Sequence, residues 1–459
     1  MACAGAPFEE LVREILDTPR DRIFEAMAAR LRAGLDPSTL LAADFHAAVR
    51  AVTPSVDAVM HSLLVVNSVN LVGAATDPRL RLVGVLWAID NFKGEQGIRQ
   101  TPLAAPDEAR VPATASAARE LLRAGLDAFD PDDADAGAAG MVRSADRGEL
   151  VDLLLRYSAR DGSDAHRQIA PAQCFRALDA FGWDCAEAVF RWVARLLAEG
   201  SSNASVSTFE SSVDLASRGV DLGGTSYDLS WGRALLAQSR TDSALGMRDA
   251  VAAALADGLA RDALWDALLA ASAEVVLRGN GGSGLHRFDA TNAMRWAMSR
   301  AGTPELRALL LLQAAAFIPP TRVEGTSWRS PPPFRELDID ALAPSSGPAE
   351  LERLFEAGGD GRAFVDDVAP AETALAWFGQ GGSVCEYVTR ARQLVVRKGQ
   401  VDAHFVKFPA AVFEEIERVD PFWVPRLLAA ELLVNPSPVR HDDWPHYERA
   451  LALAAELGL

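Results

Sequence analysis

Apolar residues recur along most of this chain at spacings of three and four positions, which is the period of an amphipathic α-helix. No stretch shows the two-residue alternation of a half-buried strand. The helical pattern is interrupted at glycine, proline and clustered polar residues. It predicts helices within 8–33, 37–51, 56–72, 79–92, 186–199, 247–259, 262–277, 304–317, 349–356, 370–378, 384–396, 410–418, 422–433 and 444–457. The chain is therefore predicted to be all-α.

We expect these 459 residues to form a single large multi-helix domain, although the length could also hold two or three ordinary domains. Stretches rich in proline, glycine, serine or aspartate predict surface loops. These loops are 101–113, 127–140, 201–230 and 323–348, and the last is the best candidate for a boundary.

The composition is that of an ordinary globular protein, with 49% hydrophobic and 24% charged residues. Abundant alanine, leucine and arginine support the helical interpretation. The net charge of −18 argues against a nucleic-acid-binding protein, which normally has a basic surface. No apolar run approaches the roughly 20 residues of a membrane span, and the N-terminus lacks a secretory pattern. We therefore expect a cytoplasmic protein without a membrane partner.

The four cysteines show no CxxC spacing, and we expect reduced, buried thiols at Cys3, Cys174, Cys185 and Cys385. Nearly every basic residue is an arginine. This bias draws attention to the three lysines, which are Lys93, Lys398 and Lys407.

Four histidines, spread over the four quarters of the chain, each accompany a helical pattern. They are His61, His166, His286 and His404. Positions three, four, seven and eight after each of the first three are mostly small or apolar, so these rings are expected on buried helix faces. The third follows a glycine-rich turn at 281–284. The pattern predicts that the four rings converge on one site.

Neutral imidazole is the commonest protein ligand of first-row transition metals. A lysine can ligate a metal only when it is deprotonated or converted by CO₂ to a carbamate. Lys407 lies three residues after His404 and would share its helix face, although Pro409 would start a new helix or kink this one. The alternative is that each histidine is a hydrogen-bonded core residue, since no close-spaced motif such as HExxH is present.

Other polar residues are candidates for supporting roles. Asp289 falls three residues after His286, where it could orient the imidazole as a catalytic carboxylate or be an ordinary acid of the helix face. Asn67 and Asn70 stand in an apolar run, so they are expected to tie helices together or to line a pocket. The remaining histidines are expected at the surface, and they are His46, His441 and His446.

The order and spacing of several stretches resemble those of a known family. Residues 61–67 are similar to the family's His-Pro-Leu-Ile-His stretch, with Val65 in place of its second histidine. Residues 166–184 and 265–295 look like its central and third blocks, and 402–407 match its late Asp-x-His-x-x-Lys block. From about residue 55 to 415 the chain thus resembles the questin oxidase-like proteins.

This resemblance implies an oxygenase of secondary metabolism that uses O₂ to open or expand a ring of a polycyclic aromatic polyketide, such as an anthraquinone. It also implies non-haem iron held by four histidines and a carboxylated lysine. These ligands correspond here to His61, His166, His286, His404 and Lys407. Five protein ligands leave one octahedral position for O₂ or substrate. A dry pocket for the flat substrate would be formed by tryptophans such as Trp87, Trp183 and Trp296.

Two other functions remain open. One is a metal-free, NADPH-dependent monooxygenase of the Baeyer–Villiger type, although the chain has no dinucleotide-binding fingerprint. The other is a non-enzymatic all-α binding protein whose histidines belong to the core. The valine at position 65 points to a substrate or chemistry that differs from the family's type members. A homodimer is compatible with all three functions.

Overall fold

The described part of the chain is helical. The computed structural model describes residues 6–55, 60–74, 77–98, 100–160, 165–183, 186–199, 203–278, 281–319, 337–347, 349–358, 368–398, 403–439 and 443–459. Within these ranges it contains 22 helices and no strand, with one isolated bridge between Ser226 and Leu259. The predicted all-α class is confirmed. None of the described helices is both long and apolar enough to cross a bilayer.

The chain divides into two compact units, and each is described by itself. The first comprises residues 1–161, 166–203 and 444–459, and the second comprises 162–165 and 204–443. The expectation of a single domain stays a prediction.

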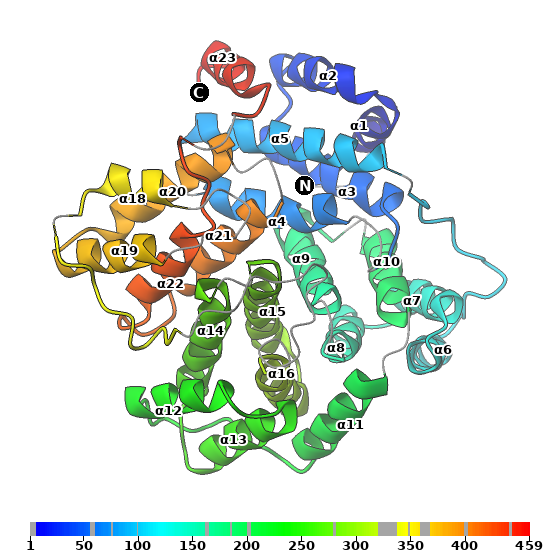
Figure 1. Ribbon diagram of the computed structural model, residues 1–459. Coiled ribbons are helices and arrows are strands. Elements are labelled where there is room, and N and C mark those ends of the chain that lie inside the picture. The colour runs from blue at the N-terminus through cyan, green and yellow to red at the C-terminus, as the bar shows by residue number, and fades with distance from the viewer. Residues whose placement is uncertain are drawn as a thin grey trace. The chain divides into compact units, whose positions relative to one another are not determined.

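The first unit is built around α3, which contacts α1, α4, α5, α9 and α10 (Figure 1). Its helices are α1 (Ala6–Asp17), α2 (Arg20–Arg32), α3 (Pro37–Ala51), α4 (His61–Ala74), α5 (Pro78–Gln96), α6 (Ala115–Ala128), α7 (Pro131–Ser144), α8 (Arg147–Ser158), α9 (His166–Phe181), α10 (Ala186–Ala198) and α23 (Tyr447–Glu456). The predicted helix 37–51 is confirmed with these bounds, because Asp36 caps the backbone N–H groups of Ser38 and Thr39.

The acidic stretch 127–140, which we expected to be a surface loop, lies mostly in helix α7. Asp130 caps this helix through two backbone N–H groups of the first turn, and Pro131 occupies the first helical position. Gly137 lets α7 approach α6, because a Cβ at this position would lie 2.4 Å from the Leu122 nitrogen. The residues that suggested a turn therefore start a helix and allow its close packing.

The second unit places α15 against α14, α16 and α21 (Figure 1). Its helices are α11 (Asn203–Ser217), α12 (Leu229–Ser239), α13 (Ala244–Ala256), α14 (Arg261–Leu277), α15 (Gly281–Arg300), α16 (Pro304–Phe317), α18 (Leu351–Ala357), α19 (Ala369–Gly379), α20 (Val384–Lys398), α21 (His404–Glu415) and α22 (Val424–Leu432).

The other expected loops had mixed outcomes. The stretch 101–113 contains no helix, as predicted. In contrast, 201–230 contains α11 and the start of α12, so the prediction of one long loop was wrong. Serines within α11 bond to carbonyls of their own helix, as Ser212 does to Thr208, which makes them compatible with it. Most of 323–348 lies outside the described residues.

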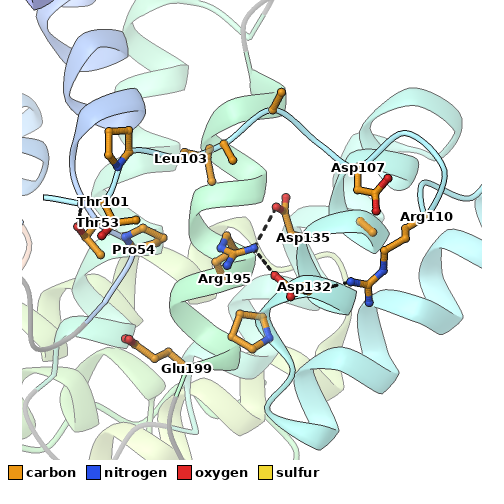
Figure 2. Close-up of a pocket in the computed structure, with 15 residues that line it drawn as sticks. Thr53, Pro54, Thr101, Leu103, Asp107, Arg110, Asp132, Asp135, Arg195 and Glu199 are labelled. Atoms are coloured by element: carbon orange, nitrogen blue, oxygen red, sulfur yellow. Dashed lines mark hydrogen bonds and ion pairs between the residues drawn. The ribbon is translucent and has the colours of Figure 1, made fainter.

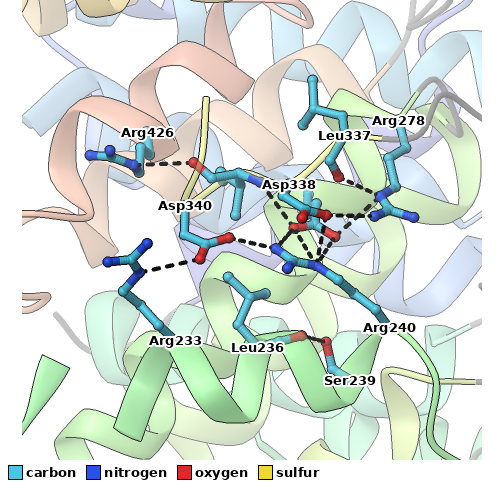
Figure 3. A network of polar contacts seen from close by, with 11 residues as sticks. Arg233, Leu236, Ser239, Arg240, Arg278, Leu337, Asp338, Asp340 and Arg426 are labelled. Atoms are coloured by element: carbon cyan, nitrogen blue, oxygen red, sulfur yellow. Dashed lines mark hydrogen bonds and ion pairs between the residues drawn. The ribbon is translucent and has the colours of Figure 1, made fainter. Parts of the chain in front are cut away.

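A buried carboxylate fixes the non-helical segment 337–342 to the rest of the second unit (Figure 3). Glu274 of α14 accepts a hydrogen bond from Arg240 at 2.7 Å and forms an ion pair with Arg278 at 3.1 Å. It also accepts the backbone N–H of Ile339 at 3.0 Å. Asp340 pairs with Arg240 at 2.6 Å. These contacts hold the fully buried Ile339 in the core.

A second buried carboxyl, Glu431 of α22, is held by neutral partners. Tyr387 donates its hydroxyl to Glu431 Oε2 at 2.8 Å, and the Asn435 amide donates to the other oxygen. Phe355 packs against the Tyr387 ring, with centroids 4.9 Å apart. Because these hydrogen-bond partners are neutral, burial has the largest effect and raises the pKa of Glu431 from 4.5 to about 7.

Replacing Glu431 by glutamine should flatten the pH dependence of stability. A carboxyl with a raised pKa in the folded chain stabilises it fully below 4.5, and this contribution is lost as the pH rises through about 7. The wild type should thus lose stability between pH 5 and 8, by on the order of 3 kcal/mol if the shift is fully expressed. Urea unfolding across this range measures the effect. The surface variant Glu417→Gln is the control, and parallel profiles for Glu431→Gln and the wild type would contradict the prediction.

Candidate metal centre

Two of the predicted site histidines meet in the second unit. His286 of α15 and His404 of α21 are 118 residues apart in the sequence, and their Nε2 atoms are 2.7 Å apart. The ring centroids are separated by 4.8 Å, and the rings are inclined by 52°. Both side chains are half-buried. The pair therefore presents two imidazole nitrogens to one point between two packed helices.

The helix α21 carries His404 at its first position and Lys407 one turn later. Lys407 is 1% exposed, so its long side chain is enclosed by protein. The helix continues through Pro409 to Glu415. No new helix starts at this proline, and His404 and Lys407 share one helix as the spacing predicted.

The glycine-rich stretch before His286 forms helix instead of the expected turn. Helix α15 begins at Gly281, five residues before the histidine. Gly284 lies against Val276 of α14, where an added Cβ would be 2.8 Å from the Val276 nitrogen. The glycine thus permits the close approach of two helices, and this approach sets the position of the next turn, which holds His286.

The other two histidines meet in the first unit. His61 is the first residue of α4, and His166 is the first residue of α9. Their ring centroids are 5.7 Å apart, and both side chains are half-buried. Further along the contact between these helices, the buried Asn67 amide donates to Gln173 Oε1 at 2.7 Å. Asn67 therefore ties the two helices together, which is one of the roles expected for it.

The backbone that enters α9 is strained. Ala165, directly before His166, has a φ of 73°, in the left-handed region that alanine rarely adopts. Such a conformation costs about 1–2 kcal/mol relative to the right-handed region. Its side chain is fully buried, so packing holds it in place. The role of His166 as a site residue stays a prediction.

The donor atoms of the second unit fit a transition-metal ion. Two nitrogens bound at right angles to one ion at about 2.1 Å would lie about 3 Å apart. The observed Nε2 separation of 2.7 Å is close to this value, and it also suits a direct hydrogen bond between the rings. A carboxylated Lys407 would add the anionic oxygen that such a site needs. Asp289 is buried on α15, one turn after His286, and its catalytic role stays a prediction.

The prediction that His46 lies at the surface was wrong. Its side chain is 1% exposed and packs edge-on against Phe8 and Phe45. Burial, with a smaller contribution from Arg50, lowers the pKa of His46 to about 4. The apolar residues on both sides of this histidine were the signal that could have indicated its burial. His446 is half-buried against Phe24, and His441 lies outside the described residues.

All three lysines are buried. Lys93 donates to the carbonyl oxygens of Ile15 and Leu16, at the end of α1. Lys398 pairs with Asp443 at 3.1 Å. These two lysines thus have structural roles, whereas Lys407 stands on the helix of a site histidine.

The described cysteines differ from one another. Cys174 is buried, and burial raises the pKa of its thiol. Cys385 is exposed, so the expectation of a buried thiol was wrong there. The other two cysteines lie outside the described residues.

A pocket of about 440 Å³ lies in the first unit, and no histidine is among the residues that line it (Figure 2). The loop 101–105 and helices α7 and α10 line it. Arg195 is one of the lining residues, and it forms ion pairs with Asp132 at 2.9 Å and with Asp135 at 3.2 Å. None of the four predicted site histidines lines this pocket. It also differs from the expected aromatic pocket, because it contains none of the lining tryptophans Trp87, Trp183 and Trp296.

Comparisons with protein-family models, curated proteins and solved structures found no match to this chain. The resemblance to questin oxidase-like proteins therefore rests on the order and spacing of its motifs.

The substitution Gly284→Ala should destabilise the protein and disturb the His286–His404 pair. The new methyl group would force α15 away from Val276, and overpacking of this kind costs about 1–3 kcal/mol. Thermal unfolding measures the loss. Gly379→Ala is the matched control, because an added Cβ there meets nothing within 4 Å and should be neutral or slightly stabilising. Equal stability of the two variants would contradict the packing argument.

Proposed function

We propose that this chain is a non-haem iron-dependent oxygenase that opens or expands a ring of a polycyclic aromatic substrate. The single observation that carries the proposal is the pairing of His286 with His404. Two helices distant in the sequence bring these half-buried imidazole nitrogens to 2.7 Å from each other. The polyketide class of the substrate comes from the motif resemblance alone.

The proposed ligands are His286, His404 and Lys407, with His61 and His166 added by the resemblance. A ligand set that combines histidine nitrogens with an anionic oxygen suits iron better than a set of neutral ligands alone would. When bound, iron supplies O₂ activation in this chemistry. The chain itself supplies imidazole rings held on the ends or early turns of helices.

Lys407 would act as a carbamate. Its uncharged amine attacks the carbon of CO₂, a new N–C bond forms as one C=O π bond opens to place the electron pair on oxygen, and water takes the proton that leaves the nitrogen. The product has two oxygen acceptors in place of a buried ammonium group, which removes a positive charge from a site meant for a cation. Asp289, one turn from His286, would orient the imidazole of that histidine.

Purified, tag-free protein should contain about one iron per chain, and His286→Ala should lose most of it together with O₂-dependent turnover. Elemental analysis measures the metal. His446→Ala is the control, because it removes a half-buried histidine that packs on Phe24. Two ions per chain would mean that each histidine pair binds its own metal. Protein that lacks metal and takes up no Fe(II) would overturn the proposal in favour of a metal-free monooxygenase or a binding protein.

Incubation with ¹³C-labelled bicarbonate should produce a carbamate signal in the ¹³C NMR spectrum, and Lys407→Met should abolish it. The same variant should bind iron at least tenfold more weakly, because it loses the anionic ligand. Lys398→Met, which removes a lysine of similar burial, should keep both the signal and the iron. A carbamate signal that survives in Lys407→Met would contradict this role.

A further inference from the structure

Within the described part of the chain, no side chain at the N-cap position caps the helix that begins with His61. Met60 accepts the first helical hydrogen bonds through its carbonyl oxygen, from the N–H groups of Leu63 and Leu64. Met60 therefore occupies the N-cap position, but its thioether is only a weak acceptor. The N–H of Ser62 has no acceptor within the helix, because it belongs to the first turn.

A residue from another helix supplies this acceptor. Glu95, in the last turn of α5, accepts the Ser62 N–H through Oε2 at 2.8 Å. The bond is buried, and Glu95 is 7% exposed. A hydrogen bond from a backbone N–H to a carboxylate is shorter and stronger than one between neutral groups. The contact therefore fixes the first turn of α4 relative to α5.

A second acid lies beside Glu95. Asp44 of α3 is completely buried, and within the described structure its carboxyl oxygens have no hydrogen-bond partner. Burial, followed by the nearby Glu95 carboxylate, raises the pKa of Asp44 well above its usual value. Of these two acids, Glu95 is the one that faces the positive end of the α4 dipole.

We propose that Glu95 is a positioning residue for His61, which it acts on through the Ser62 backbone. The inference rests on the proposed function, because it assigns His61 to the metal site. Loss of the cap would let the first turn of α4 fray. The His61 ring, one residue from the capped N–H, would then lose its fixed place beside His166.

The substitution Glu95→Leu should have two effects. In metal-free protein, hydrogen exchange in the first turn of α4 should become at least tenfold faster, as seen by mass spectrometry of the peptide that contains Ser62. The affinity for Co²⁺, measured by calorimetry, should fall by about 10–100-fold, which is typical when a residue that supports a metal ligand is removed. Glu95→Gln keeps an oxygen acceptor, so its exchange and its Co²⁺ affinity should stay within about threefold of the wild type.

Thr114→Val is the matched control, because it removes the side-chain cap of α6, a helix without a site histidine. It should speed exchange in α6 and leave the Co²⁺ affinity unchanged. Should Glu95→Leu not fold, Glu95→Asp makes the same comparison, since its shorter carboxylate cannot keep the bond to Ser62.

The outcomes separate this inference from the proposed function. Wild-type protein that binds no Co²⁺ would overturn the metal site itself. Wild-type binding that is retained in Glu95→Leu, or lost tenfold in Glu95→Gln, would overturn the positioning role alone.

Discussion

A carboxylate that is removed from water must be paired or hydrogen-bonded, and this requirement joins distant helices in both units. Glu274 joins α14 to Arg240 and to the backbone of Ile339. Glu415 of α21 is fully buried and accepts from Arg295 and Asn292 of α15, each at 2.7 Å. The same two helices carry His404 and His286. The pairing of Glu415 therefore holds together the elements on which the proposed site is built.

Glycine and capping residues solve a second problem, which is to bring helices close enough for such polar contacts. Gly137 and Gly284 remove the Cβ atoms that would collide with Leu122 and Val276. Caps such as Asp130 satisfy the exposed ends of the helices. In α4 the first-turn N–H of Ser62 is capped by Glu95, which belongs to the different helix α5. The position of the first turn then depends on packing, and no longer on the local sequence.

The proposed chemistry follows from these constraints. The four rings are half-buried and stand at the ends or early turns of helices, where the surrounding backbone is held in place. The three buried lysines differ in their surroundings and therefore in their roles. Lys93 caps α1, Lys398 pairs with Asp443, and Lys407 shares a helix with His404. Only the last has a position from which a carbamate could serve a histidine site.

The sequence by itself determined the fold class and many helix bounds, such as 37–51 and 304–317, because periodicity and capping are local properties. It also singled out the four histidines, because each stands beside an apolar helical pattern. It misassigned 127–140, where acids and glycines served capping and packing, and it missed the burial of His46. The pairing of His286 with His404 was decided by tertiary structure, since a contact across 118 residues leaves no local pattern. The same holds for Glu95 and Ser62, which meet only because α4 and α5 pack against each other.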